Sequence, residues 1–249
     1  MEGMILAAGA GTRLGPLTQG IPKALVPVGG KPLLGWVAER MARAGVTRII
    51  VNTHHHEDQI RSYLQEFPLP GVHFVLSPEP GGPFETGGGL IHAAPLFREG
   101  APFLLHNVDV LSTISLEEMV SRHQAMSTMG GGRLVASLAV QDREAQRKLL
   151  FDDRGLMGWE NRGSDRAPEG RLQIRDPVGE IRPRAFTGIH VVDPVLFRLG
   201  DRKGTFSIVT LYLELAKAGW LIRPIEVTGE DWFDIGTPER LREARAYFS

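Results

Sequence analysis

The chain of 249 residues contains no cysteine. Disulfide bonds, thiolate nucleophiles and cysteine-ligated metal sites are therefore excluded. No apolar run reaches the roughly 18 residues that a membrane-spanning helix needs, and the first residues show neither a basic lead nor an apolar signal segment. These absences predict a cytoplasmic protein without a membrane partner.

An excess of charge of either sign is also missing. The chain has 28 Lys and Arg against 29 Asp and Glu, which gives a formal net charge of −1. A nucleic-acid-binding protein usually carries a basic face, and the linear pattern contains none. Nucleic acid is therefore not an expected partner. The hydrophobic content of 42% is sufficient for a large buried core.

Glycine is plentiful, and two glycines follow an apolar run near the N-terminus. Residues 4–8 are apolar without alternation, as in a strand that is buried on both faces. Gly9 and Gly11 allow the backbone to turn tightly and to present its N–H groups to an anion. Arg13 adds a planar fork of donors, and Lys23 adds a compact positive charge. This segment therefore predicts a site for polyphosphate.

Two other phosphate-binding motifs fit the sequence less well. A dinucleotide-binding GxGxxG motif needs glycine where Leu14 stands and an acidic residue about 20 positions later, but the next carboxylate after Glu2 is Glu39. A P-loop needs lysine directly after its last glycine, followed by serine or threonine, which this segment lacks. The consecutive histidines 54–56 cannot all point to one metal ion from a helix or strand, so we expect them in a loop.

Residues 6–28 resemble the opening signature of the sugar-phosphate nucleotidyltransferases, LAAGxGTRLxPLTxxxPKxLxPV. These enzymes join a nucleoside triphosphate to a sugar 1-phosphate and release pyrophosphate. The resemblance implies that Arg13 lies on the β- and γ-phosphates and that Lys23 neutralises charge near the α-phosphate, so both are predicted catalytic residues. It also implies that the loop binds the nucleotide through Leu6, Ala7, Ala8, Gly9, Gly11 and Thr12.

A second glycine-rich turn, ETGGGL at residues 85–90, stands at the predicted start of a helix. Its bare backbone can approach a flat base closely. The turn resembles the base-side loop of the same family, and its form is most similar to that of the N-acetylmuramate 1-phosphate uridylyltransferases, followed by the heptose-phosphate guanylyltransferases. Glu85, Gly87 and Gly88 are accordingly predicted to bind the nucleotide.

Two aspartates are predicted to hold Mg²⁺. Asp109 follows the apolar run 103–108, and the carboxyl end of a strand in an open parallel sheet faces the ligand crevice. Asp234 lies in the segment WFDIGTP, residues 232–238. The resemblance implies that these positions jointly bind Mg²⁺, a hard cation that prefers oxygen ligands. Val108 departs from the glycine that usually precedes the first aspartate.

The segment FTGIHV at residues 186–191 resembles the strand that lines the family's sugar pocket. The family's E-K-P segment, whose lysine meets the sugar phosphate, is absent, and residues 159–161 (Trp-Glu-Asn) stand in a comparable place. Arg182 or Arg184 can supply the missing positive charge. The predicted sugar contacts are Asn107, Glu160, Thr187 and Gly188.

The order of segments predicts an α/β fold. Expected strands at 4–8, 48–52, 72–76 and 102–107 alternate with expected helices at 32–44, 57–66, 87–97 and 115–128. Strands are also expected at 133–140, 185–192 and 221–227, with helices at 207–218 and from 237. The resemblance implies a three-layer α/β/α fold of the nucleotide-diphospho-sugar transferase type, with a Rossmann-like mixed, mostly parallel sheet. Residues 1–249 are expected to form a single domain in which 141–184 are a sugar-side insertion of β-hairpins.

UTP and N-acetylmuramate 1-phosphate are the preferred substrates on this interpretation. GTP with heptose or mannose 1-phosphate is the alternative, and a regulatory relative that binds nucleotides without turnover is a third. Such a regulator should have lost Arg13, Lys23 or a metal-binding aspartate, and this chain keeps all four. The expected assembly is a monomer or a small homo-oligomer.

Overall fold

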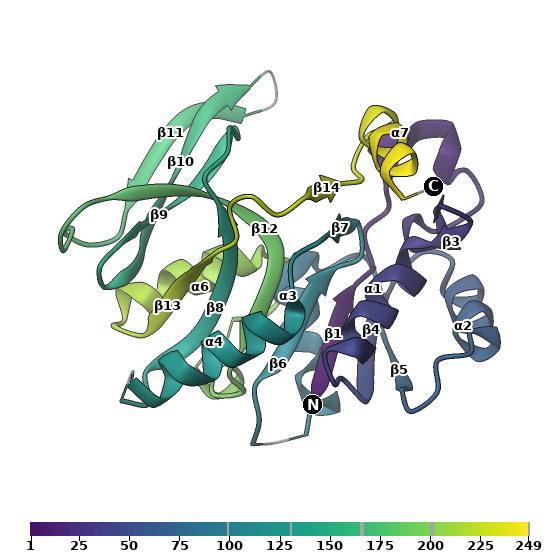
Figure 1. Cartoon of the computed structure of the whole chain (residues 1–249), viewed down its shortest axis with the longest axis horizontal. Helices are drawn as coiled ribbons and strands as arrows, with labels where there is room; N and C mark the ends of the chain where they lie inside the picture. The colour runs from purple at the N-terminus through teal and green to yellow at the C-terminus, as the bar shows by residue number, and fades with distance from the viewer. Residues whose placement is uncertain (99, 130, 165–166, 200–201, 249) are drawn as a thin grey trace.

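The computed structural model describes residues 1–98, 100–129, 131–164, 167–199 and 202–248. The order of its strands confirms an α/β fold built on one central sheet (Figure 1). The sheet contains β1 (Glu2–Leu6), β4 (Arg48–Thr53), β5 (His73–Pro78), β6 (Phe103–Asn107), β8 (Leu134–Gln141), β9 (Arg147–Asp152), β10 (Gly155–Ser164), β11 (Ala167–Gln173), β12 (Arg182–Val192) and β13 (Leu221–Glu226).

The main path through the sheet runs β11-β10-β9-β12-β6-β1-β4-β5, with β8 beside β12 and β13 beside β8. Strands β6, β1, β4 and β5 are parallel, whereas β12 runs antiparallel to β6, β8 and β9. The parallel half matches the expected alternation of strands and helices, because parallel neighbours require crossover connections.

Helices cover both faces of the sheet and give it two cores. Along β1, Ile5 belongs to one core and Met4 and Leu6 to the other, because successive side chains of a strand point to opposite faces. The first core includes residues from α1 (Leu33–Arg43), α2 (Glu57–Glu66), α4 (Leu116–Met129) and α7 (Pro238–Tyr247). The second includes residues from α3 (Glu85–Ala93), α5 (Leu196–Leu199) and α6 (Ile208–Lys217). The predicted three layers are therefore confirmed.

Two predicted boundaries differ in the structure, one because of strand pairing and one because of a proline. Strand β1 begins at Glu2, earlier than predicted, because Glu2 pairs with Arg48 in the sheet and forms an ion pair of 2.6 Å with it. Ala7 and Ala8 therefore belong to the following loop. Helix α3 ends at Ala93, and residues 94–96 form a 3-10 turn that contains Pro95, which has no N–H to continue the helix.

Strands β9, β10 and β11 form the predicted hairpins. Strands β9 and β10 pair antiparallel, and the expected turn at residues 153–155 joins them. The buried carboxylate of Asp152 accepts hydrogen bonds from the amides of Arg154 (2.9 Å) and Gly155 (3.1 Å), which fixes this turn. Because β9 also pairs with β12, the hairpins extend the central sheet.

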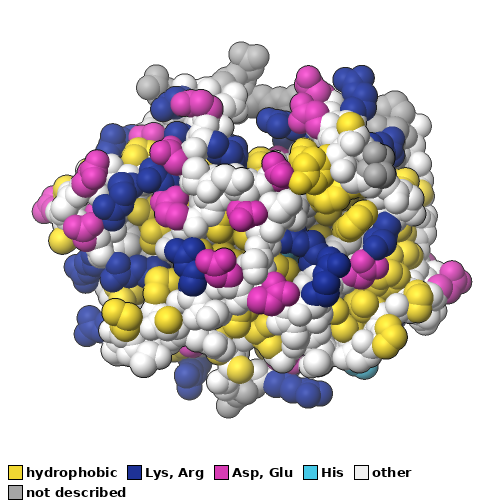
Figure 2. All heavy atoms as spheres, viewed as in Figure 1, with side chains coloured by type: hydrophobic (Ala, Val, Ile, Leu, Met, Phe, Trp, Pro, Cys, Tyr) yellow, Lys and Arg dark blue, Asp and Glu magenta, His cyan; other side chains and the backbone are white. Residues whose placement is uncertain are grey.

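Two short pairings outside the central sheet were not predicted. Strands β2 (Pro27–Val28) and β3 (Lys31–Pro32) form one ribbon, and β7 (Val110–Ser112) and β14 (Trp232–Asp234) form the other. The second ribbon joins segments more than a hundred residues apart, and it controls the geometry of the candidate site. Figure 2 shows acidic and basic side chains interspersed over the visible face, with a hollow at its top between the β10–β11 hairpin and α7.

Candidate active site

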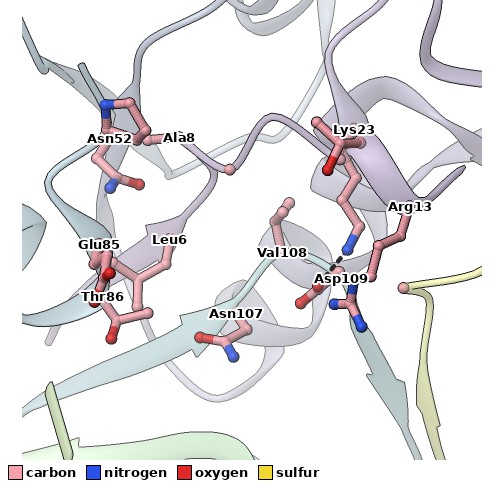
Figure 3. A pocket seen from close by; sticks show the side chains of 15 residues that line it. Leu6, Ala8, Arg13, Lys23, Asn52, Glu85, Thr86, Asn107, Val108 and Asp109 are labelled. Carbon is pink, nitrogen blue, oxygen red and sulfur yellow. Dashed lines mark hydrogen bonds and ion pairs between the residues drawn. The ribbon is translucent and has the colours of Figure 1, made fainter. Parts of the chain in front are cut away.

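A pocket of about 360 Å³ lies at the carboxyl ends of β1, β4 and β6. Figure 3 shows Glu85 and Thr86 at one end of it and Arg13, Lys23 and Asp109 at the other. We call it the first pocket. It is lined by Leu6, Ala8, Gly9, Gly11, Thr12, Arg13, Lys23, Asn52, Pro83, Glu85, Thr86, Asn107, Val108, Asp109 and Gly236.

The loop after β1 is held by close packing against Lys23. Gly11 has φ 64°, in the left-handed region, and a Cβ at this position would lie 2.9 Å from the Cβ of Lys23. Glycine is therefore required there by both conformation and space. The carbonyl of Gly11 accepts a hydrogen bond of 2.9 Å from the amide of Leu14, which closes the turn.

A buried polar network secures the start of the same loop. Asn52, at the end of β4, accepts a hydrogen bond of 2.6 Å from the amide of Ala7 and donates one of 2.7 Å to Glu79. The other carboxylate oxygen of Glu79 accepts the amide of Phe84 at 2.7 Å. A Cβ on Gly89 would lie 2.5 Å from Glu79, so this glycine makes room for the network. The sequence signal for Asn52 was a polar residue ending a buried apolar strand.

Lys23 and Asp109 meet at the far end of the first pocket. The Nζ of Lys23 donates to the Oδ2 of Asp109, and their side chains are 8% and 23% exposed. Figure 3 shows the Arg13 guanidinium directed to the same carboxylate. A Cβ on Gly236 would lie 3.0 Å from the Nη2 of Arg13, so the loop after β14 packs closely on this arginine. Lys23 thus pairs with the partly buried Asp109 carboxylate, and Arg13 lines the same end of the first pocket.

The β7–β14 ribbon brings Asp234 to the same place. Asp234 pairs with Val110 across the ribbon, and the amide of Ile235 donates to the carbonyl of Asp109 at 2.8 Å. Burial, and then the negative charge of Asp109, raise the pKa of the Asp234 carboxyl above its ordinary value. Two neighbouring carboxylates that repel each other in this way form a suitable pair of oxygen ligands for a divalent cation.

Two carboxylates can hold a hard divalent cation such as Mg²⁺. Within the described part of the chain, no group of three or more His, Cys, Asp or Glu residues could enclose a metal ion. Mg²⁺ is typically held by one or two carboxylates while water and substrate phosphates complete its shell. Asp109 and Asp234 are the residues here that could hold such an ion, with the remaining ligands supplied by solvent or by a bound ligand.

A second pocket, of about 610 Å³, adjoins the first and shares Arg13, Asn107 and Asp109 with it. Gly188 has φ 84°, and a Cβ there would lie 2.6 Å from the side-chain Nδ2 of Asn107. The second pocket is lined by Arg13, Asn107, Asp109, Val110, Arg143, Glu144, Ala145, Gln146, Phe186, Thr187, Gly188, Trp232, Asp234 and Arg240.

Comparison with known proteins decides the family. Residues 2–147 match the family model described as Nucleotidyl transferase, which is more than half of the chain. The chain belongs to the nucleotidyl transferase family. It is 32% identical to an N-acetylmuramate alpha-1-phosphate uridylyltransferase of Neisseria meningitidis serogroup B, over 99% of this chain and 97% of that protein.

Two further comparisons agree. A mannose-1-phosphate guanyltransferase of Kluyveromyces lactis is 28% identical over 96% of this chain, which spans 62% of that longer protein. A solved structure of a putative glucose-1-phosphate thymidylyltransferase from Bacillus anthracis has a TM-score of 0.76 and 21% identity, covering 100% of this chain and 95% of that one. This likeness confirms the fold. The chain is thus a member of a family of sugar-1-phosphate nucleotidyltransferases.

The structure brings most of the predicted site residues of this nucleotidyl transferase together. The predicted residues of the N-terminal loop line the first pocket, except Ala7, whose amide is bound by Asn52. Thr187 and Gly188 line the second pocket with Asn107 and both aspartates. The hydroxyl of Thr187 donates to the carbonyl of Ala139 at 2.9 Å. Their proposed contacts with ligands stay predictions.

Gly87 and Gly88 lie outside the lining of the first pocket, unlike Glu85. Their amides donate to the carbonyl of Phe206 at 2.9 and 3.2 Å. A Cβ on Gly87 would lie 2.5 Å from the Phe206 ring, and one on Gly88 would lie 2.2 Å from the carbonyl oxygen of Gly204. Close packing of α3 on the segment before α6 therefore explains why both positions need glycine, and their predicted contact with the base stays a prediction.

Glu160 lines neither pocket. Its carboxylate lies 3.9 Å from Arg171 across the β10–β11 pairing. Its neighbours Trp159 and Asn161 instead line a third pocket, of about 540 Å³, which contacts α6. Adjacent residues of a strand face opposite sides of the sheet, so Glu160 faces away from the third pocket. The predicted sugar contact at Glu160 stays a prediction, and neither the second nor the third pocket is lined by this residue.

The two arginines suggested as replacements for the missing lysine are already paired with carboxylates. Arg182 contacts Asp153 at 2.9 Å, and Arg184 contacts Glu226 at 2.6 Å. Neither lines the first or the second pocket. Arg143, which the sequence did not single out, does line the second pocket.

Among the described residues, no helix is long and apolar enough to cross a membrane.

Proposed function

We propose that this chain joins a nucleoside triphosphate to a sugar 1-phosphate and releases pyrophosphate, with UTP and N-acetylmuramate 1-phosphate as its substrates. The observation that carries the proposal is the cluster of Arg13, Lys23, Asp109 and Asp234 where the first and second pockets meet. The nucleotide would occupy the first pocket and the sugar 1-phosphate the second. Family membership supports the type of reaction.

In this reaction an oxygen of the sugar phosphate attacks the α-phosphorus, and the bond from that phosphorus to the bridging oxygen of the β-phosphate breaks. The second pKa of a phosphate monoester is about 6, so the nucleophile is already ionised at neutral pH and needs no general base. Lys23 would offset charge on the α-phosphate, and Arg13 would bind the departing pyrophosphate with its fork of donors.

Mg²⁺ held by Asp109 and Asp234 would supply Lewis-acid stabilisation of the phosphate oxygens. The contact from Lys23 keeps the Asp109 carboxylate oriented towards the junction of the pockets. The loop around Gly11 would bind phosphate oxygens through its amides while excluding bulk water.

The proposed base and sugar rest on the two uridylyltransferase relatives, each 32% identical over nearly the full length of both chains. GTP with mannose or heptose 1-phosphate is the second candidate, which the 28% identity to mannose-1-phosphate guanyltransferases favours. A cytoplasmic location and a monomeric or small homo-oligomeric state remain predictions alongside these substrates.

Pyrophosphate release should be measured with UTP, GTP, CTP, ATP and dTTP against N-acetylmuramate, N-acetylglucosamine, mannose and heptose 1-phosphates. We expect UTP with N-acetylmuramate 1-phosphate to give the highest kcat/KM, and EDTA to abolish turnover until Mg²⁺ is restored. Asp234→Asn should abolish turnover, whereas Asp142→Asn, at a carboxylate with a 61% exposed side chain, should not. Saturable nucleotide binding without turnover on any acceptor would instead identify a regulatory protein.

A further inference from the structure

Arg143 lines the second pocket, and its guanidinium has no carboxylate partner among the residues that the structure describes. It follows β8, and its Cζ lies 3.9 Å from the centre of the Trp232 ring. Within the described ranges, no carboxylate oxygen lies within 4.0 Å of its guanidinium, and its Nε is buried without a hydrogen-bond partner. A contact of 3.4 Å from Nη1 to the carbonyl of Glu144 is the hydrogen bond that it makes.

The ring beneath Arg143 is fixed. The Nε1 of Trp232 donates to the carbonyl of Thr187 at 2.9 Å, and the backbone of Trp232 pairs with Ser112 in the β7–β14 ribbon. Trp232 and Asp234 are two residues apart on β14, so their side chains leave the strand on the same face. The stacked guanidinium is thereby held on the face of the ribbon that carries the Asp234 carboxylate.

The two Nη groups of Arg143 are the donors that a phosphate in the second pocket could reach, because Nε is buried. A guanidinium that lies flat on an aromatic ring uses its face for that contact and keeps its N–H groups in its plane, where they can bind two oxygens of a phosphate. Burial lowers the pKa of Arg143, and the positive charge of Arg240 adds to this effect, while Asp234 opposes it. An anion bound at the guanidinium would relieve the burial of an unpaired cation.

We propose that Arg143 binds the phosphate of the acceptor. This inference rests on the proposed function. The acceptor phosphate must lie beside the metal-binding aspartates to attack the α-phosphorus, and Arg143 shares the second pocket with both. The second pocket contains two other arginines. Arg13 also lines the first pocket, where the nucleotide would bind, and Arg240 contacts Glu243 at 3.2 Å. Arg143 is therefore the arginine we assign to the acceptor phosphate.

Steady-state kinetics of Arg143→Gln, Arg143→Lys and Arg184→Gln tests the proposal. Arg143→Gln should raise the KM for the sugar 1-phosphate roughly 10- to 100-fold, the usual loss for one charge-assisted hydrogen-bonding group, and leave the KM for the nucleotide within about twofold. Arg143→Lys should recover part of the loss, because lysine keeps the charge without the fork. Arg184→Gln removes a guanidinium from the same sheet and should leave both KM values unchanged.

A second readout reports phosphate recognition directly. Inorganic phosphate should inhibit the wild-type enzyme in competition with the sugar 1-phosphate, and Arg143→Gln should weaken that inhibition by about the same factor as the acceptor KM. Circular dichroism and thermal melts verify that each variant is folded. If Arg143→Gln does not fold, Arg143→Lys still carries the test through a raised acceptor KM.

Several results would overturn the proposal. If the wild-type protein turns over its substrates and both Arg143→Gln and Arg143→Lys keep the wild-type KM for the acceptor, the proposal is refuted and the proposed function is left intact. A raised nucleotide KM with an unchanged acceptor KM would assign Arg143 to the nucleotide, and equal effects of Arg184→Gln would show a general loss of positive charge. Absence of turnover by the wild-type protein on every substrate pair would remove the proposed function and this inference with it.

Discussion

Three buried histidines predict that the protein loses stability in mild acid. His106, His123 and His190 are at most 1% exposed. Burial lowers the pKa of His106 and of His190 to about 3, and that of His123 to about 4. Each Nδ1 has one partner, namely the carbonyl of Asn107, the hydroxyl of Ser137 and the hydroxyl of Tyr212, respectively. These rings therefore fold as neutral groups.

The sign of the effect follows from linkage. An unfolded histidine, with a pKa of about 6.5, binds a proton below that pH, whereas the folded histidines stay neutral until pH 3 to 4. Stability is therefore full above pH 6.5 and falls as the pH decreases through this window. Between pH 7 and pH 5 each histidine contributes a loss of about 2 kcal/mol, and the three together about 5–6 kcal/mol. Folded domains of this kind have only about 5–15 kcal/mol in total.

Urea unfolding followed by circular dichroism at pH 7 and pH 5 measures this loss. His123→Gln should remove about one third of the pH dependence, whereas the same substitution at the exposed His73 should not alter it. Because His106 lies on β6 immediately before Asn107, acid should also inactivate the enzyme at the pH where unfolding begins. A difference below about 1 kcal/mol between the two pH values would refute the assignment of three neutral buried rings.

The remaining predictions concern single side chains. Arg13→Lys should lower kcat roughly 10²-fold with little change in melting temperature, because it keeps the charge but loses the fork; undiminished turnover contradicts this role. Gly188→Ala should lower the free energy of unfolding in urea by about 1–2 kcal/mol because of the left-handed backbone alone. It should also lower kcat/KM for the acceptor, because the new Cβ would displace the side chain of Asn107. Wild-type values for both quantities would show that Gly188 and Asn107 are not in close contact. Arg175→Met should destabilise the protein by about 3–5 kcal/mol, since it leaves the fully buried Asp152 carboxylate without its cation. Arg162→Met is the control, because the Arg162 side chain is 57% exposed in its ion pair with Glu144.

Local patterns were sufficient for much of the fold and for one side of the site. The apolar run before Gly9 predicted a strand buried on both faces, and β1 indeed divides its side chains between the two cores. Gly11, Arg13 and Lys23 could be placed together because they lie within a short stretch of chain. Helices were expected from about residue 207 and from residue 237, and the side chains of Ser207 and Thr237 cap α6 and α7 there.

Features decided by contacts between distant segments could not be predicted in the same way. Strands β7 and β14 have three residues each, too few for a periodic signal, and they are strands because they pair with each other. Gly87 and Gly88 carry the composition of a ligand-binding turn, but Phe206, far along the chain, uses their open space. The position of Glu160 depended on which face of β10 is turned to α6, and a one-residue shift reverses that choice.

Val108 shows how packing can replace a glycine beside the proposed metal site. Its backbone is outside the left-handed region, so no glycine is needed for its conformation. Its amide donates to the carbonyl of Leu6 at 3.1 Å, which extends the contact between β1 and β6 beyond their last paired residues. Its side chain is 4% exposed and belongs to the first core. Asp109 is therefore held on one side by a buried valine and on the other by Ile235 of the loop after β14, and core packing fixes the two aspartates relative to each other.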